Sequence, residues 1–363
     1  MHNPLRDVLK LAVDSNASDI HIKTDALISM RIDGGLVECD FKATKNVVDK
    51  FIDLMLNDIL LKKYEALGDV DVSYVEDDVG RFRVNIHKQR GSTGITMRHV
   101  KAKILDFKSL GLPPQTKKIA ELERGIVFLT GTTGSGKSTT LASIINYINE
   151  HKSKHIITIE DPIEYEFFDE KSFIEQREVG LDTISFDSAF IHSLRQDPDI
   201  IVVGEMRSKE SFDAALKAAD TGHLIFSTLH TMNASQSINR LLDFYDASEH
   251  LALRKSLANS LAAIISQRLI PKITGKGVIP AVEIMLNTPI IQSLLSENKL
   301  DKLAPAIEGS KNEGMQTFNQ ALVDLVNEGT ITEEQAIKFA TNPEALKMNL
   351  RGVFLGTDGQ ILG

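Results

Sequence analysis

Cysteine is almost absent from this chain of 363 residues, which contains only Cys39. A single thiol cannot form an internal disulfide or build a structural zinc site of the four-cysteine type. Long apolar runs are also lacking, because the best candidate, residues 278–286, is interrupted by Pro280 and Glu283. Residues 1–10 mix charged and polar side chains and contain no apolar core of a signal peptide. We therefore expect a soluble protein without a disulfide, a zinc ion or a membrane anchor of its own.

Positive charge is in deficit, since 41 Lys and Arg residues face 50 Asp and Glu residues and the net charge is −9. This balance argues against a broad basic surface for nucleic acid, although a local basic stripe stays open. Hydrophobic residues at 42% and charged residues at 25% are typical of a globular protein. The length favours two domains.

Residues 1–106 predict a mixed α+β domain. Polar and apolar residues alternate over residues 18–23 and 80–86, as they do in half-buried strands. An apolar stripe over residues 47–61 predicts a helix. The next segment, residues 107–118, contains glycine and prolines and is interpreted as an interdomain linker.

Residues 119–340 predict a parallel sheet covered by helices, because short apolar runs alternate with longer helical stretches. The predicted strands span residues 126–130, 156–160, 200–203 and 224–229. Beyond residue 248 the pattern is mostly helical, and residues 341–363 are expected to form a loosely packed tail. The predicted fold class is therefore α/β, with a smaller α+β domain in front.

The most specific motif is GTTGSGKS at residues 131–138, which fits the pattern G-x-x-x-x-G-K-[ST]. Glycines let the backbone wrap around a triphosphate, Lys137 adds a charge at the β- and γ-phosphates, and Ser138 can bind Mg²⁺. A strand before the loop and a helix after it favour a nucleotide site over a Gly/Ser-rich turn. The residues expected to contact ATP here are Gly131, Thr132, Thr133, Gly134, Ser135, Gly136, Lys137, Ser138 and Thr139.

Two glutamates follow predicted strands at the sheet edge where ligands of parallel sheets bind. Phosphoryl transfer to water needs a carboxylate that orients the water and an acidic group that holds hydrated Mg²⁺. Glu164 suits the first role and Glu205 the second. The alternative is that both are ordinary solvated acids at strand ends.

His223 and His230 flank the predicted strand 224–229. Seven residue steps of about 3.3 Å place them roughly 23 Å apart, so they should not share a metal ion. His230 lies at the phosphate end, whereas His223 lies at the opposite end and is better placed to meet a neighbouring subunit. A structural role is the alternative for both.

Arg81 and Arg83 share one face of the strand at residues 80–86, and Arg98 lies on its expected partner strand. A solvated surface is one interpretation of this cluster. The other is an arginine finger, which ATPases often supply from outside the domain that binds the nucleotide.

Several motifs together resemble the secretion-type ATPases, and more narrowly the PilT/PilU family of type IV pilus retraction ATPases. They are residues 134–140, 158–164, 176–180, 204–207 and 221–230, with further matches at residues 17–21, 80–84 and 314–318. The resemblance covers nearly the whole chain to about residue 340.

The resemblance implies a PAS-like N-terminal domain and a RecA-like P-loop ATPase core with a helical C-terminal region. It also implies a ring hexamer in the cytoplasm, peripheral at the inner membrane, with ATP and Mg²⁺ between subunits. The catalytic residues that it implies are Glu164, Glu205, Lys137 and His230, with Ser138 and Glu205 at the metal. It places His223 in the His box, and it places Arg81, Arg83 and Arg98 among arginines that approach the nucleotide. The implied partners are an inner-membrane pilus platform protein and a second retraction ATPase, with no nucleic acid and no zinc.

Two departures refine the resemblance. Relatives that assemble pili carry a further N-terminal region and a four-cysteine zinc motif. This chain is short and has only Cys39, and this difference favours retraction. Residues 289–297 lack two arginines of the PilT type, and this region looks closer to PilU-type accessory motors. The predicted function is a hexameric ATPase motor for pilus retraction. The alternatives are a PilU-type ATPase that needs a second motor, a RecA-like nucleic-acid motor and a non-motor nucleotide-binding regulator.

Overall fold

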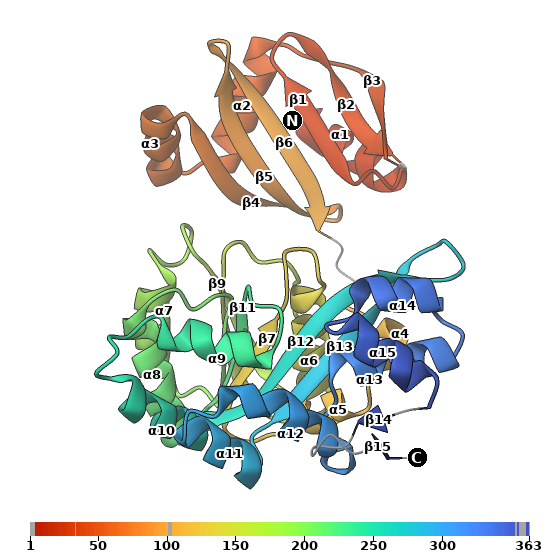
Figure 1. Ribbon diagram of the computed structural model, residues 1–363. Helices are drawn as coiled ribbons and strands as arrows, with labels where there is room; N and C mark the ends of the chain where they lie inside the picture. Colours follow the sequence, from red (N-terminus) through yellow and green to blue (C-terminus); the bar gives the residue numbers. More distant parts are fainter. Residues whose placement is uncertain (1–3, 33, 101–103, 353, 356–360, 363) are drawn as a thin grey trace. The chain divides into compact units, whose positions relative to one another are not determined.

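The chain forms two compact units in the computed structural model (Figure 1). The structure describes residues 4–32, 34–100, 104–352, 354–355 and 361–362. The first unit comprises Met1–Lys103 together with two later segments, Asp161–Glu166 and Glu178–Ile184. The second unit comprises Ile104–Glu160, Phe167–Arg177 and Ser185–Gly363.

The first unit is built on a six-stranded antiparallel sheet with strand order β3-β2-β1-β6-β5-β4. Its strands are β1 (Asp19–Lys23), β2 (Ala26–Ile32), β3 (Gly35–Ala43), β4 (Asp69–Glu76), β5 (Gly80–Gln89) and β6 (Ser92–Val100). Its helices are α1 (Pro4–Asp14), α2 (Lys45–Met55) and α3 (Asp58–Leu67).

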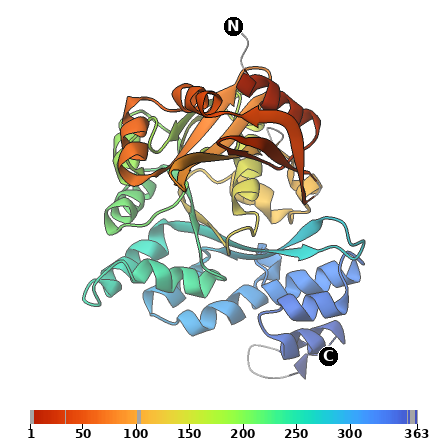
Figure 2. The ribbon, with the colours of Figure 1, turned by 90° about the horizontal axis from the view of Figure 1, so that it is seen from above.

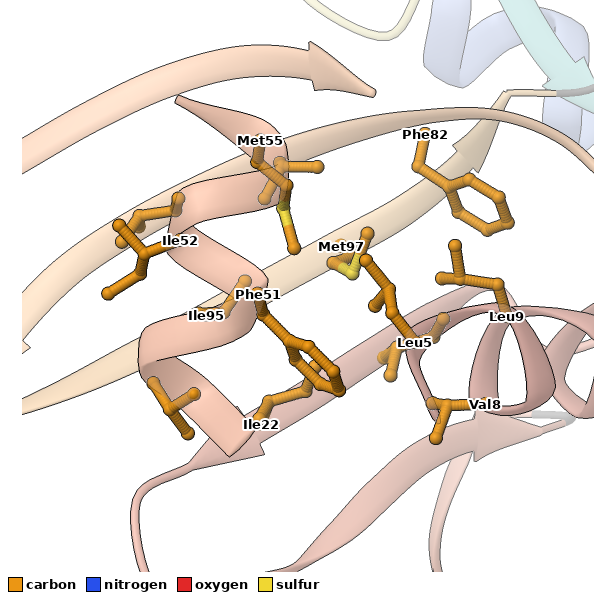
Figure 3. Close-up of a cluster of buried hydrophobic side chains, with 14 of the residues drawn as sticks. Leu5, Val8, Leu9, Ile22, Phe51, Ile52, Met55, Phe82, Ile95 and Met97 are labelled. Atoms are coloured by element: carbon orange, nitrogen blue, oxygen red, sulfur yellow. The ribbon is translucent and has the colours of Figure 1, made fainter. Parts of the chain in front are cut away.

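The core of the first unit lies between this sheet and the apolar faces of α1 and α2 (Figure 3). Leu5 and Leu9 of α1 and Phe51 of α2 are completely or almost completely buried there. On β5 the expected alternation is confirmed, because Phe82 is buried whereas Arg83 is exposed. The arginines of this strand therefore point away from the core.

The helix expected over residues 47–61 is two helices, because the chain is extended at Leu56. Asn57 then caps α3, and its Oδ1 accepts from the backbone N–H groups of Ile59 and Leu60. Asparagine at this position offers the backbone a local partner that ends one helix and begins the next. Helix α1 and strands β3 and β4 were not among the expected elements.

The second unit contains a seven-stranded sheet with strand order β13-β12-β7-β11-β10-β8-β9. Its strands are β7 (Gly125–Thr130), β8 (His155–Glu160), β9 (Phe173–Glu178), β10 (Ile200–Val203), β11 (Leu224–Leu229), β12 (Leu261–Pro271) and β13 (Val278–Leu286). Strands β12, β7, β11, β10 and β8 are parallel to their neighbours in that series, and β13 is antiparallel to β12. The four predicted strands are thus present, and β10 and β11 have the predicted bounds.

Helices cover both faces of this parallel sheet (Figures 1 and 2). Val127 and Leu129 pack on one face with Ile144 of α6 (Lys137–His151). On the other face Phe128 packs against Phe212 of α8 (Lys209–Asp220), with 6.2 Å between the ring centroids. All six residues of β7 are buried, as expected for a central strand of a parallel sheet that is covered on both faces. The other helices between β8 and β12 are α7 (Phe186–Ser193), α9 (Ala234–Leu242) and α10 (His250–Ser260).

Where an interdomain linker was expected, the structure has two short helices, α4 (Phe107–Leu110) and α5 (Gln115–Ala120). Leu112 and Ile119 are buried in the core of the second unit. Gly111 adopts the left-handed conformation that ends α4, so the glycine marks a helix end. Burial of Leu112 and Ile119 ties this segment to the second unit.

The region beyond residue 248 departs from the expected helical pattern, because β12 and β13 form a long hairpin there. Helices follow the hairpin: α11 (Pro289–Ser296), α12 (Leu303–Gly309), α13 (Phe318–Asn327), α14 (Glu333–Phe339) and α15 (Pro343–Leu350). In the region expected to be a loose tail, Leu346 of α15 is fully buried in a cluster with Phe318 and Leu322. The rest of that expectation, at residues 353, 356–360 and 363, lies outside the described residues.

Among the described residues, no helix has the length and apolar character needed to span a bilayer.

Candidate functional site

The glycine-rich loop joins the end of β7 to the start of α6, as its motif predicts. Gly131, Gly134 and Gly136 have φ values of 149°, 78° and 85°, which side chains of L-residues rarely allow. Gly136 is the residue before the first turn of α6, so the unpaired N–H groups of that turn point toward the loop. Such a helix start favours an anion.

Lys137 is the first residue of α6, directly after the loop, and is only 9% exposed. Its Nζ donates to the backbone oxygens of Gly131, at 2.8 Å, and Thr132, at 3.1 Å. The cation is thus held where a phosphate would enter the loop. Ser138 and Thr139 are half-buried in the first turn of α6.

A cavity of about 240 Å³ adjoins the loop. Residues 131–135 of the loop line it together with Met232, Leu269 and Phe339. Thr132, Thr133 and Gly134 are exposed at its mouth, whereas Ser135 is buried. The loop therefore presents both backbone and hydroxyl groups to a space large enough for part of a nucleotide.

Glu205 and His230 meet at the same edge of the sheet. Glu205 follows β10 and His230 follows β11, and these strands are parallel neighbours whose carboxyl ends coincide. His230 Nε2 lies 3.9 Å from Glu205 Oε2. Glu205 Oε2 also accepts a hydrogen bond from Arg207 Nη2 at 2.6 Å. Thr228 Oγ1 of β11 donates a hydrogen bond to the backbone oxygen of Gly204 at 2.6 Å, next to Glu205.

His223 lies at the other end of β11, next to the last turn of α8. Its Nδ1 is 3.0 Å from the backbone oxygen of Ala218 and 3.2 Å from Thr221 Oγ1. Because β7 and β11 are parallel, His223 is at the sheet edge opposite the glycine-rich loop. The structure therefore separates the two histidines, as the sequence predicts.

Glu164 belongs to the first unit, in the segment Asp161–Glu166. Its Oε1 lies 3.4 Å from Arg83 Nη1, and both side chains are partly exposed. The structure thus brings together the glutamate expected to orient water and one of the arginines expected to approach the nucleotide.

The other two arginines also contact carboxylates of the first unit. Arg81 Nη2 lies 3.3 Å from Glu178 Oε2. Arg98 Nη2 lies 2.8 Å from Asp19 Oδ1. Burial alone would raise the pKa of Asp19, but the Ser18 hydroxyl and the Arg98 guanidinium hold it below its usual value.

The donor set suits Mg²⁺ bound together with a nucleotide. Magnesium in such sites keeps several waters and takes one or two protein oxygens plus phosphate oxygens. The Ser138 hydroxyl and the Glu205 carboxylate are oxygen donors of this kind. In the part of the chain that the structure describes, no three His, Cys, Asp or Glu side chains converge on a metal site.

Reasoning from the sequence assigned no role to three residues that the structure places in contact with other elements, although one of them, Glu178, lies in the motif at residues 176–180. Glu178, with its side chain 3% exposed, accepts from Ser73 Oγ at 2.7 Å and from the backbone N–H of Ile163 at 3.1 Å. Glu283 of β13 accepts from the backbone N–H of Ala234 at 2.9 Å. Burial raises the pKa of Glu283 to about 7.

Gln267 of β12 is the third, and it contacts the glycine-rich loop directly. The only sequence signal for it is the polar pair Ser266 and Gln267, which together with Arg268 interrupts an otherwise apolar run. That run was interpreted as helical, so the pair could not be placed beside the loop.

The chain has a strand, a glycine-rich loop and a helix in succession, and an acidic side chain follows a neighbouring parallel strand. This arrangement defines the class of P-loop nucleotide-binding proteins. The chain belongs to the type II/IV secretion system protein family, whose sequence model matches residues 2–334.

Its relatives include retraction ATPases. The type IV pilus retraction ATPase PilT of Pseudomonas aeruginosa is 40% identical over 341 residues, which cover 94% of this chain and 99% of PilT. The type IV pilus ATPase PilU of the same organism is 36% identical, with 95% and 90% covered. A twitching motility protein of Neisseria gonorrhoeae is 42% identical over 82% of this chain and 80% of its own length.

Solved structures agree with this assignment. A crystal structure of the pilus retraction motor PilT with bound ADP matches with a TM-score of 0.87 at 43% identity, covering 96% of this chain and 99% of that one. The ATPase DotB of Legionella pneumophila matches with a TM-score of 0.81 at 25% identity, covering 97% and 96%. The expected fold class, an N-terminal domain followed by a RecA-like ATPase core, is confirmed. The predicted kinship with retraction ATPases is confirmed as well.

Proposed function

We propose that this protein is an ATP-hydrolysing motor that powers type IV pilus retraction as a homohexamer. The observation that carries the proposal is the glycine-rich loop with Lys137 directly after it, on a chain related to PilT over almost its full length. ADP bound to PilT supports a nucleotide at the corresponding place.

The predicted site residues of the two units have different roles in hydrolysis. Backbone N–H groups of the loop and the Lys137 ammonium bind the phosphates. Ser138 and Glu205 would hold Mg²⁺, which when bound neutralises charge on the β- and γ-phosphates. Glu164 orients the attacking water and accepts its proton at a carboxylate oxygen. His230, beside Glu205, adds a hydrogen-bonding group at the same edge.

We place the nucleotide at a seam between copies of the chain. Arg81, Arg83 and Arg98 supply positive charge from the first unit, as arginine fingers do in other ATPases. In the described conformation Arg83 contacts Glu164, and exchange of this contact for a phosphate would leave the carboxylate to orient water. His223, at the opposite sheet edge, is placed to meet the neighbouring copy.

Hydrolysis at these seams would move the units of the ring and act on an inner-membrane platform protein of the pilus. A ligand shifts such an equilibrium only through its different affinity for the two states, so ATP and ADP must favour different arrangements. The site of action would be the cytoplasmic side of the inner membrane at the pilus base. The binding partners would be further copies of the chain, the platform protein and a second retraction ATPase.

One observation favours an accessory role of the PilU type over independent retraction. Residues 289–297, which include α11, lack the two arginines of the PilT type. Complementation of a strain that lacks both retraction ATPases distinguishes the two roles. Retraction by this protein alone would support the PilT-type role, and retraction only together with a second ATPase would support the PilU-type role.

The direct test is phosphate release by the purified protein and by Lys137→Ala, with ATP and Mg²⁺. Loss of the ammonium should lower turnover at least about 100-fold, because it removes charge stabilisation from the transferred phosphoryl group. A variant that keeps most of its hydrolysis would contradict the assigned site. Strong stimulation by single-stranded DNA would instead favour a nucleic-acid motor.

A further inference from the structure

Gln267 connects the hairpin β12–β13 to the glycine-rich loop from inside the second unit. Its side-chain Nε2 donates to the backbone oxygen of Ser135 at 2.8 Å. Its Oε1 accepts from Thr140 Oγ1 at 2.7 Å. Both ends of one amide are therefore used, one by the loop and the other by the first turn of α6. The residue is only 4% exposed.

The bond to Ser135 fixes the orientation of a loop peptide. In a trans peptide the C=O and the following N–H point in opposite directions. Because the oxygen of Ser135 points to Gln267, the N–H of Gly136 points away from β12. Without the glutamine, this oxygen would be a buried acceptor with no partner, and the peptide could rotate to find one.

Gly136 packs so closely against Gln267 that a side chain would not fit between them. A Cβ atom on Gly136 would lie 2.7 Å from Gln267 Nε2. At Gly131, a Cβ atom would lie 2.6 Å from the backbone oxygen of Gln267. The two glycines thus give the loop its left-handed turns and also make room for the glutamine.

The strand that carries Gln267 is anchored on both sides. Ser266 Oγ accepts from Thr130 Oγ1 at 2.8 Å, next to the start of the loop. Arg268 donates to the backbone oxygen of Phe339 at 2.5 Å and to Thr341 Oγ1 at 3.0 Å. Its guanidinium carbon lies 3.8 Å from the ring centroid of Phe318. Residues 266–268 therefore join the loop to the C-terminal helices.

We infer that Gln267 is a positioning residue that holds the glycine-rich loop in its phosphate-binding conformation before nucleotide arrives. This inference rests on the proposed nucleotide site and adds to it a residue more than 130 positions away from Ser135 in the chain. The glutamine acts through the Ser135–Gly136 peptide and need not touch the phosphates itself.

The test is binding of a fluorescent ATP analogue to the full chain, measured for the wild type, Gln267→Met and Gln316→Met. Methionine keeps the size of the side chain and removes both polar atoms. Gln316 is a matched control, because its Nε2 also donates to an oxygen of the hairpin, Val282 O at 2.7 Å, but away from the loop. We expect affinity to fall about 10- to 100-fold in Gln267→Met and less than about twofold in Gln316→Met.

Thermal unfolding separates positioning from general stability. Without nucleotide, Gln267→Met should lose more stability than Gln316→Met, because it removes two side-chain hydrogen bonds rather than one. Only Gln267→Met should also lose most of the rise in Tm that ATP produces. Wild-type affinity in Gln267→Met would overturn the inference. If Gln267→Met does not fold, Thr140→Val removes the other partner of the amide and should weaken binding at least about threefold, whereas Thr140→Ser should not. If Thr140→Val binds as the wild type does, the inference fails. A wild type that binds no nucleotide would instead refute the proposed function.

Discussion

The Glu164 and Arg83 side chains contact each other in the first unit, and this contact bears on the roles proposed for both. At 3.4 Å and with partial exposure on both sides, the pair is held weakly by solvent-screened charge. A weak pair is easily exchanged when a more highly charged ligand arrives. This suits the role proposed for Glu164, which is to orient water after ATP has bound.

Glu164→Gln should bind ATP and hydrolyse it at least about 100-fold more slowly, because an amide cannot accept the proton of the attacking water. Single-turnover hydrolysis and binding of a fluorescent ATP analogue measure the two steps separately. Glu166→Gln, two residues further along the same segment, serves as the control. Undiminished turnover in Glu164→Gln would remove this residue from the role of base.

Glu283 gives the second unit a pH-dependent stability. Burial raises its folded-state pKa to about 7, above an ordinary value of 4.5. Between these values the folded state binds more protons than the unfolded state, so stability falls as pH rises from about 4.5 to about 7. The penalty is then fully present above pH 7 and amounts to about 3 kcal/mol at most.

Glu283→Gln should remove this dependence, because an amide can still accept from Ala234 and carries no charge to bury. Urea unfolding at pH 5 and pH 8 should give a variant more stable than the wild type at pH 8 and similar to it at pH 5. Glu297→Gln is the control, since the Lys299 ammonium lowers the pKa of Glu297 and the change of stability with pH from this group falls below pH 4.5, outside the range tested. Equal pH dependence in wild type and Glu283→Gln would contradict this account.

At the scale of elements, the hairpin β12–β13 organises the second unit around the nucleotide site. β12 lies beside β7, which leads into the glycine-rich loop. β13 supplies Glu283 to the start of α9, and Arg268 of β12 contacts the C-terminal helices. The hairpin therefore contacts the strand before the loop, the start of α9 and the C-terminal helices.

Arg268→Ala should detach the C-terminal helices from the hairpin. The side chain supplies two hydrogen bonds and a cation–π contact, and its loss should destabilise the chain by about 2–3 kcal/mol. Limited proteolysis should then cut near α14 and α15 faster than elsewhere. Arg268→Lys, which keeps the charge over Phe318, should be intermediate. Wild-type resistance to protease in Arg268→Ala would show that these helices do not depend on the arginine.

Elements were predictable where a local pattern decides the structure. β10 and β11 are short, mostly apolar runs between turn-forming residues, and their bounds follow from the sequence. The hairpin was not predictable in this way, because a long apolar run fits a buried strand and a buried helix equally well. Asn57 shows a third case, in which one capping side chain divides an apolar stripe into two helices.

In the candidate site, too, the residues of a local motif were predictable and those with distant partners were not. Lys137 and the glycines belong to one contiguous motif whose chemistry is readable from the residues themselves. Gln267 and Glu178 act on partners far away in the chain, and only the folded structure brings them together. The first unit's arginines were recognised as a cluster, but their carboxylate partners follow from sheet register and from segments inserted later in the chain.

At the scale of the whole molecule, the two units carry different parts of the proposed reaction. The second unit holds the glycine-rich loop, Glu205 and His230. The first unit holds the arginines and includes Glu164 through a segment that leaves the second unit and returns to it. If copies of the chain complete one another's sites, activity must depend on assembly.

The most direct test measures phosphate release per subunit while the protein is diluted in ATP and Mg²⁺, with molar mass followed by light scattering. The account predicts that turnover per subunit falls as the mass drops from six copies to one. Hydrolysis that stays constant when only monomers remain would contradict a site completed between copies.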